Sequence, residues 1–264
     1  HRSPKRVAFI PRHGFNGGGF FHRGAGLPAW GRRMVSEGGM DAASRFPSVG
    51  IDGPAGAGKS TVARRVAERL GFLFVDTGAM YRAVTLAAMR AGTPLEDDAA
   101  MGAVARACTI TFSPDGTAVF LDGEDVSAAI RTPELTRNIR HAASAPSVRA
   151  VLVARQQSMA RERPVVMEGR DITTVVIPGA KWLFYLDASV ECRVRRRLAD
   201  LVASGQKADP EELRLDIVAR DQSDFNRAVG PLCRTPEQVY LDTSGMTADA
   251  VIAAIIDRVR ADGA

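Results

Sequence analysis

The residues with the clearest chemical purpose form one glycine-rich stretch, residues 53–61. It has a glycine, four free positions and then Gly-Lys-Ser, a pattern that binds nucleotide phosphates when it joins a strand to a helix. An apolar run at 48–52 predicts the strand, and Val62, Val66 and Leu70 share one face of a helix over 61–70. A glycine-rich turn that binds nothing is disfavoured, because strand, loop, Lys-Ser and helix follow in the required order. The stretch consists of Gly53, Pro54, Ala55, Gly56, Ala57, Gly58, Lys59, Ser60 and Thr61.

Each residue type in this stretch has a physical role in binding ATP. Glycines let the backbone aim its N–H groups at phosphate oxygens, and the start of the following helix adds a partial positive charge. Lys59 supplies a cation for the β- and γ-phosphates, and the Ser60 hydroxyl is suited to ligate Mg²⁺. The sequence therefore predicts an ATP site here, with Mg²⁺ as the cofactor.

Other polar residues follow predicted strands at the place where parallel α/β sheets bind their ligands. Strand 72–76 is followed by Thr77, Tyr81 and Arg82 at the start of a helix. A hydroxyl, an aromatic ring and a guanidinium in that place suit a phosphorylated acceptor. The alternative is an N-cap threonine beside ordinary surface residues. The same edge of the sheet is expected to carry residues 168–171, Glu-Gly-Arg-Asp.

Arginines crowded on two predicted helices are a second signal for anion binding. Arg220, Asp224 and Arg227 have helical spacing, so all three can share one face. Like charges crowded on a helix are unfavourable unless an anion neutralises them, and guanidinium forks match phosphate oxygens. The alternative is a solvated basic face paired with nearby aspartates. The more crowded helix carries Arg193, Arg195, Arg196 and Arg197.

The remaining pattern alternates strands with helices, which predicts a doubly wound parallel α/β sheet. Strands are expected at 48–52, 72–76, 165–167, 182–186 and 239–242. Helices are expected at 61–70, 79–91, 93–107, 133–143, 146–161, 189–203, 210–229 and 247–259, with Thr77 as the N-cap of the second. A β-hairpin at 109–112 and 119–121 interrupts the alternation and indicates a small β-containing insert.

Composition and charge restrict the class of protein. The 264 residues, 45% of them hydrophobic, suffice for a full core, and no apolar run reaches the ~18 residues of a membrane span. Three widely separated cysteines favour a reducing cytoplasm over a disulfide framework. The net charge is +5, but seven Lys/Arg and one Glu in residues 1–39 give +6, which leaves −1 for the rest. A near-neutral body argues against a nucleic-acid partner.

The chain from about residue 48 to 261 resembles the bacterial cytidylate kinase family of phosphate-loop nucleoside-monophosphate kinases. The stretches GRDI and NRAV are much more specific for this family than the phosphate loop, which many NTPases share. The hairpin insert also matches that family's enlarged monophosphate-binding subdomain. The resemblance rests on IDGPAGAGKST at 51–61, DTGAMYR at 76–82, LDGEDV at 121–126, IRT at 130–132, EGRDI at 168–172, RD at 220–221 and DFNRAV at 224–229.

The resemblance implies roles for individual residues. It places Arg82, Arg170 and Arg220 at the acceptor phosphate, and Arg149 and Asp171 at the cytosine edge. Thr77 and Tyr81 join the substrate-binding residues. The remaining implied assignments are Asp224 and Arg227 at the sugar, Arg196 and Arg197 in a short lid that closes on ATP, and Lys59, Arg170, Arg196 and Arg197 as catalytic cations.

The sequence departs from the family pattern at three positions. Thr173 stands where the family usually has glycine, and we interpret this as a tolerated change in a loop. Ser223 replaces an arginine or another polar residue. Arg140 stands where the family has a hydroxyl residue that can touch the base, so no role is assigned on that helix.

The resemblance implies a monomeric cytoplasmic kinase that uses Mg²⁺ and transfers phosphate from ATP to CMP or dCMP, with no membrane or nucleic-acid partner. Residues 1–46 hold glycine and basic charge without periodicity, which favours a disordered basic leader or sequence upstream of the natural start, with Met34 and Met40 as candidate starts. Residues 47–264 are expected to form a kinase domain with an insert at about 109–150 and a lid at about 193–220. Rival functions are a kinase of another acceptor, such as another nucleotide or shikimate, a regulatory GTPase and an RNA-binding protein. A guanine reader needs Asn-Lys-x-Asp, and no asparagine here precedes lysine.

The leader hypothesis has a direct test. A chain that begins at Met40 should match the full chain in melting temperature and turnover, because residues 1–39 hold glycine and charge without a periodic apolar face. A loss of several degrees, or of most of the activity, would show that the leader packs on the core.

Overall fold

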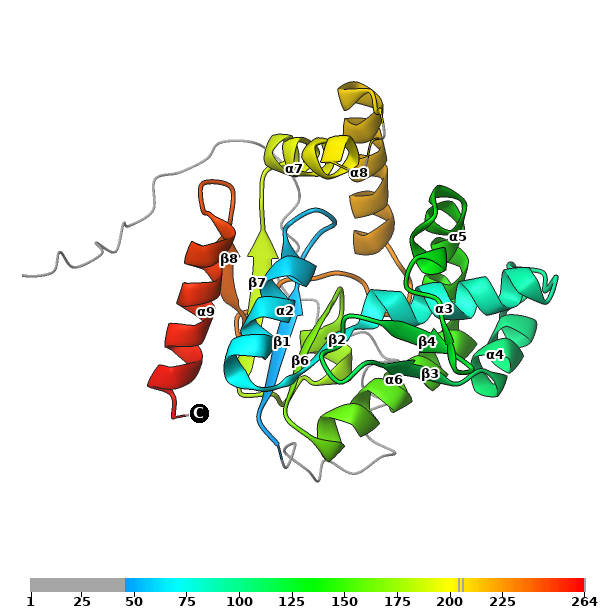
Figure 1. Ribbon diagram of the computed structural model, residues 1–264, viewed down its shortest axis with the longest axis horizontal. Helices are drawn as coiled ribbons and strands as arrows, with labels where there is room; N and C mark the ends of the chain where they lie inside the picture. Colours follow the sequence, from blue (N-terminus) through cyan, green and yellow to red (C-terminus); the bar gives the residue numbers. More distant parts are fainter. Residues whose placement is uncertain (1–45, 204, 206, 264) are drawn as a thin grey trace, which may run out of the picture. The chain divides into compact units, whose positions relative to one another are not determined.

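The computed structural model describes residues 46–203, 205 and 207–263, and the predicted leader over 1–45 lies outside them. In the described ranges, five parallel strands form one sheet in the order β2-β6-β1-β7-β8 (Figure 1). The sheet confirms the predicted parallel α/β fold. Its strands are β1 Ser48–Asp52, β2 Leu73–Asp76, β6 Val165–Gly169, β7 Trp182–Asp187 and β8 Val239–Asp242.

Helices cover both faces of this sheet. Parallel strands that are buried on both faces need apolar side chains on both, which is why these strands are nearly continuous apolar runs. On one face, Val49 and Phe184 belong to a core shared with α2 and α9. On the other face, Val75 and Met167 belong to a core shared with α3 and α6. The helices are α2 Lys59–Leu70, α3 Thr77–Arg90, α4 Asp98–Ala107, α5 Pro133–Ser144, α6 Pro146–Glu162, α7 Val190–Ala203, α8 Pro210–Phe225 and α9 Ala248–Ala261.

Three predicted helix boundaries are wrong. The N-cap of α3 is Asp76, whose Oδ1 accepts from the Ala79 N–H at 2.9 Å, so Thr77 is already helical. Helix α4 begins at residue 98 instead of 93, because the Asp97 side chain caps it. Helix α8 ends at residue 225 instead of 229, and the chain then turns through Gly230 at a φ of 61°.

In the described ranges, no helix has the length and apolar character to cross a membrane.

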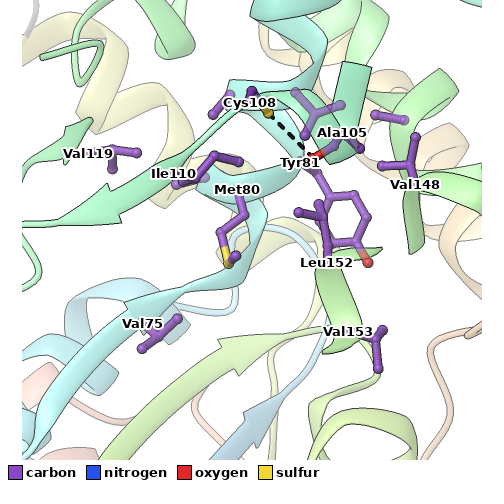
Figure 2. Close-up of a cluster of buried hydrophobic side chains, with 14 of the residues drawn as sticks. Val75, Met80, Tyr81, Ala105, Cys108, Ile110, Val119, Val148, Leu152 and Val153 are labelled. Atoms are coloured by element: carbon purple, nitrogen blue, oxygen red, sulfur yellow. Dashed lines mark hydrogen bonds between the residues drawn. The ribbon is translucent and has the colours of Figure 1, made fainter. Parts of the chain in front are cut away.

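The predicted hairpin is present between α4 and α5. Strands β3 Ile110–Phe112, β4 Val119–Leu121 and β5 Glu124–Asp125 form an antiparallel sheet there, and a short 3-10 helix, η1 Ala129–Arg131, follows. Figure 2 shows how this sheet joins the rest of the protein, since side chains from β3, β4, α3 and α6 meet in one buried cluster. The cluster includes Met80, Ile110, Val119, Val148 and Leu152.

This cluster should contribute strongly to stability. Leu152 on α6 is fully buried, so Leu152→Ala should lower the free energy of unfolding by about 2–5 kcal/mol through lost burial and a residual cavity. Chemical denaturation monitored by far-UV circular dichroism would measure the loss. Val202 on α7 is 64% exposed, so Val202→Ala is the matched control and should change it by no more than about 0.5 kcal/mol. Equal effects of the two substitutions would contradict this description of the core.

Candidate active site

The phosphate loop lies at the carboxyl edge of the sheet, between β1 and α2. Gly58, with a φ of 89°, directly precedes the first residue of α2. The first N–H groups of a helix have no acceptor within it, and this favours anion binding there. Lys59 is buried, with 5% of the residue exposed, and its Nζ donates to the Pro54 carbonyl oxygen at 2.8 Å. Burial, together with the charge of Arg170, lowers the pKa of Lys59.

A buried carboxylate, Glu168, lies beside this loop, although the sequence pattern predicts no role for it. Ser60 Oγ donates to Glu168 Oε1 at 2.7 Å, and Thr77 Oγ1 donates to the backbone oxygen of Glu168 at 2.7 Å. Burial, followed by the charge of Asp76, raises the pKa of Glu168. A usable signal was its position directly after the predicted apolar strand 165–167; in the structure this strand extends to Gly169 and includes Glu168. That strand, β6, pairs with both β1 and β2, so its end lies between the phosphate loop and α3.

Arginines from four separate segments gather beside Lys59. Burial and the charges of Arg170, Arg82 and Arg197 lower the pKa of Arg220 to about 10. Burial likewise lowers the pKa of Arg82, which donates from Nη1 to the Ile130 oxygen at 3.1 Å and to Thr136 Oγ1 at 2.9 Å. Mutual repulsion among cations is strongest where burial weakens the screening by water, and it is relieved when an anion binds. The arginine cluster, defined here as residues 82, 170, 197 and 220, is therefore the candidate anion site.

A second buried group lies between α3, α6 and the end of β6. Arg149 Nη2 donates to Asp171 Oδ2, and Arg149 Nη1 donates to the Tyr81 hydroxyl at 3.3 Å. Burial raises the pKa of Tyr81 to about 12. Gly230 covers the pair so closely that a Cβ there would collide with Arg149 Nη2 and Asp171 Oδ2. Glycine is needed at this position because of that contact and its positive φ.

Arg170, Asp224 and Arg227 connect α8 to these groups. Arg170 Nε donates to Asp224 Oδ2 at 2.6 Å, and Arg227 Nη2 lies 3.9 Å from Asp224 Oδ1. Arg227 Nη1 donates to the Ala143 oxygen at 3.3 Å. Within the described part of the chain, the buried Nε and Nη2 of Arg227 have no hydrogen-bond partner. Because unpaired buried donors are unfavourable, these atoms indicate where a polar ligand would bind.

The two predicted lid arginines on α7 have different surroundings. Arg196 Nη2 donates to the Thr243 backbone oxygen at 2.6 Å, and Arg196 Nη1 donates to the Ala57 backbone oxygen at 3.4 Å. Arg196 thus joins the phosphate loop to the end of β8. Arg197 is exposed, and its charge acts on Arg82 and Arg220. The structure therefore brings Arg197 to the arginine cluster, whereas Arg196 binds protein oxygens.

Thr173 is a buried residue and not the loop position that the sequence predicts. It belongs to a one-turn π-helix, η2 Ile172–Val176. Thr173 Oγ1 donates to Asp52 Oδ2 at 2.6 Å and accepts from Gln238 Nε2. Asp52 Oδ2 also accepts from the Thr173 backbone N–H at 2.9 Å, and burial raises the pKa of Asp52 to about 6. This network fixes the end of β1 against the residues that follow Asp171.

Comparisons with known proteins found similar sequences and structures. A sequence model described as cytidylate kinase matches residues 49–261. The cytidylate kinase of Desulforamulus reducens is 51% identical over 209 residues, which cover 79% of this chain and 94% of that protein. The cytidylate kinase of Symbiobacterium thermophilum is 46% identical over 215 residues, covering 80% of this chain and 95% of that protein. A shikimate kinase structure from Acinetobacter baumannii aligns with a TM-score of 0.41 and 18% identity, over 83% of this chain and 96% of that one.

Lys59 should be needed for activity and dispensable for folding. Lys59→Met should lower turnover about 10²-fold or more, as removal of a preorganised charge donor does. The substitution removes the hydrogen bond to Pro54, but it also removes a charged ammonium that burial disfavours. Because these effects oppose each other, the free energy of unfolding should change by no more than about 1 kcal/mol. A coupled ADP-release assay and chemical denaturation would measure the two effects. Arg69→Ala, at an exposed position of α2, is the control; near-normal turnover of folded Lys59→Met would contradict the role.

Proposed function

The chain belongs to the cytidylate kinase family and transfers a phosphoryl group from ATP to CMP or dCMP, and from this premise we propose which residues bind and align the two nucleotides. One observation carries the proposal, namely the concentration of cations around Lys59 at the carboxyl edge of the sheet. Beyond the effect of burial, Arg170 and Arg220 lower the pKa of Lys59, while Glu168 and Asp224 oppose them. Nucleotide phosphates would supply further negative charge.

The triphosphate of ATP binds to the phosphate loop, residues 53–61. Backbone N–H groups at the start of α2 face its oxygens, and the partial charge of the helix adds to their attraction. Lys59 would exchange its bond with the Pro54 oxygen for the β- and γ-phosphates. Arg196 acts on the donor side by holding the Ala57 oxygen and the end of β8.

We propose Mg²⁺ as the cofactor. Ser60 would be its protein ligand, and Glu168 and Asp76 would bind its water molecules. These residues fit because a hydroxyl and a carboxylate lie 2.7 Å apart and burial raises the pKa of that carboxyl. In the described ranges, no group of three His, Cys, Asp or Glu residues could hold a metal ion. Mg²⁺ does not need such a group, because it usually keeps several waters and binds through one or two protein groups together with phosphate oxygens. When bound, Mg²⁺ would neutralise charge on the transferred phosphoryl group.

Arg82, Arg170 and Arg220 bind the phosphate of the acceptor. They come from α3, from the residue after β6 and from α8, and the charges of Arg82 and Arg170 act on Arg220. Thr77 lies at the N-terminus of α3, where the helix favours an anion. The acceptor oxygen would then attack the γ-phosphorus in line, with no covalent enzyme intermediate. Lys59, Arg170 and Arg197 stabilise the charge in transfer, and alignment supplies the rest.

Arg149 and Asp171 read the cytosine edge. Asp171 would accept a hydrogen bond from the amino group, and Arg149 would donate to N3 and O2. The buried Nε of Arg149 has no partner in the described ranges, so it can add a donor without breaking the pair. Tyr81 holds the guanidinium from the other side. Asp224 and Arg227 bind the sugar. The guanidinium of Arg227 has unpaired donors, and beyond the effect of burial its pKa responds to the charges of Arg149 and Tyr81, so these donors lie near the base-reading pair.

We further propose that the enzyme is a cytoplasmic monomer without a nucleic-acid partner. One chain supplies the residues for both nucleotides, so the site needs no second copy. The cysteines at 108, 192 and 233 are free thiols, as a reducing compartment allows. The likeness to shikimate kinase is too distant to favour that acceptor, whereas the match at 49–261 favours a cytidine nucleotide.

Substitution of the base-reading pair should change acceptor selectivity. Uracil reverses the donor and acceptor at the edge that Asp171 and Arg149 would read, so the parent enzyme should reject UMP. Arg149→Ala and Asp171→Ala should each raise the KM for CMP and reduce the preference for CMP over UMP by about tenfold or more, with the KM for ATP little changed. Saturation curves with each acceptor on each variant would measure this.

The control for these variants is Arg161→Ala, an exposed position on the same helix as Arg149. Removing one partner leaves a buried charge unpaired, so the double variant Arg149→Ala/Asp171→Ala should be more stable than either single variant while still lacking selectivity. A parent that prefers AMP or GMP, or variants that keep the parent's ratio of CMP to UMP, would contradict the cytosine assignment.

A further inference from the structure

Arg193 on α7 is the most fully engaged arginine of the crowded helix, although neither motif nor spacing distinguishes it. Its side chain is 5% exposed. Nη1 and Nη2 form a two-pronged contact with the carboxylate of Asp221, at 3.0 Å and 2.6 Å. Nη1 also donates to the Ala55 oxygen at 3.0 Å, and Nε donates to the Ala188 oxygen at 3.1 Å. One guanidinium therefore binds the phosphate loop, the end of β7 and α8 together.

Helix α8 has few apolar contacts that could fix its position. Of residues 210–225, all described, Ile217 and Asp221 are the buried ones, and Leu215 is 54% exposed. Figure 1 shows α8 and α7 together at the end of the molecule beyond the phosphate loop. With so little apolar surface buried, directional contacts must determine where the helix lies. Those contacts are the Arg193–Asp221 pair and the Arg170–Asp224 pair.

Asp221 directly follows Arg220, the arginine that we assign to the acceptor phosphate. A shift of α8 would move Arg220 away from Arg82 and Arg170, because a helix moves as a rigid element. Misplacement by about 1 Å can cost a large factor in rate or binding when charged groups must converge on one ligand.

We propose that Arg193 and Asp221 are positioning residues that hold α8 on the phosphate loop, so that Arg220 reaches the acceptor phosphate while ATP occupies the donor site. The inference rests on the proposed assignment of Arg220. Arg193 acts on both nucleotide sites, because it contacts Ala55 and α8. Asp221 acts on the acceptor site alone, because Arg193 keeps its bonds to the Ala55 and Ala188 oxygens when only the contact with α8 is lost.

The test uses Asp221→Asn, which keeps the size and removes the charge, and Arg193→Lys, which keeps the charge and removes the fork. Asp221→Asn should raise the KM for CMP about tenfold and change the KM for ATP by less than about twofold. Arg193→Lys should raise both constants. The controls are Asp216→Asn and Arg195→Lys, exposed positions on the same two helices. Melting temperatures would show that each variant is folded at the assay temperature.

A second measurement separates positioning from a general loss of structure. If Asp221 acts through Arg220, Asp221→Asn should add less than about twofold to the KM for CMP in the Arg220→Ala background. Full additivity in that background, or an unchanged KM for CMP in Asp221→Asn, would overturn the inference. If Arg220→Ala itself leaves the KM for CMP unchanged, the assignment of Arg220 fails and the inference fails with it. If Arg220→Ala raises the KM for CMP but Asp221→Asn leaves it unchanged, the assignment of Arg220 stands and only the positioning role of Asp221 is contradicted.

Discussion

Repulsion among cations that the fold holds close together is the constraint on which the rest of the structure depends. Lys59, Arg82, Arg170 and Arg220 are brought to one edge of the sheet, and burial with mutual repulsion lowers the pKa of Lys59 and Arg220. Such an arrangement is unfavourable by itself, so the surrounding core must be stable enough to maintain it. Under the proposed function, nucleotide phosphates would relieve the same repulsion, and the free energy that it costs in folding would contribute to affinity and to charge stabilisation during transfer.

Two carboxylates near strand ends hold the segments around this cluster in position. Glu168 accepts from Ser60 and, through its backbone, from Thr77, so it fixes the start of α2 against the start of α3. Asp52 accepts from the first N–H groups of η2 and thereby positions the residues that follow Asp171. Both groups are buried, and burial raises the pKa of each. The rigid part of the site is thus built on the central strands of the sheet.

Elements whose formation depends on local signals agree with the sequence prediction. Apolar runs with glycine-rich or polar boundaries gave the strands, and Thr132 with Pro133 gave the start of α5. One error occurred where two capping residues competed. Asp76 and Thr77 are both good caps, and the carboxylate caps α3 because the Thr77 hydroxyl donates to the Glu168 oxygen across the sheet. The roles of individual site residues remain predictions, although the structure brings most of them together.

The sequence by itself determined the phosphate loop, the parallel α/β fold and the family, because these depend on residue type, spacing and period along the chain. The tertiary structure decided what each arginine of α7 does. The sequence does not distinguish the four arginines of α7 from one another. In the structure Arg193 binds Asp221 and Arg196 binds Thr243. Arg195 and Arg197 are both exposed, and of these two Arg197 belongs to the arginine cluster. Thr173 likewise gained its role from Asp52, 121 residues earlier. Periodicity fixes which face of a helix a side chain occupies, but its partners come from distant segments that only folding brings into contact.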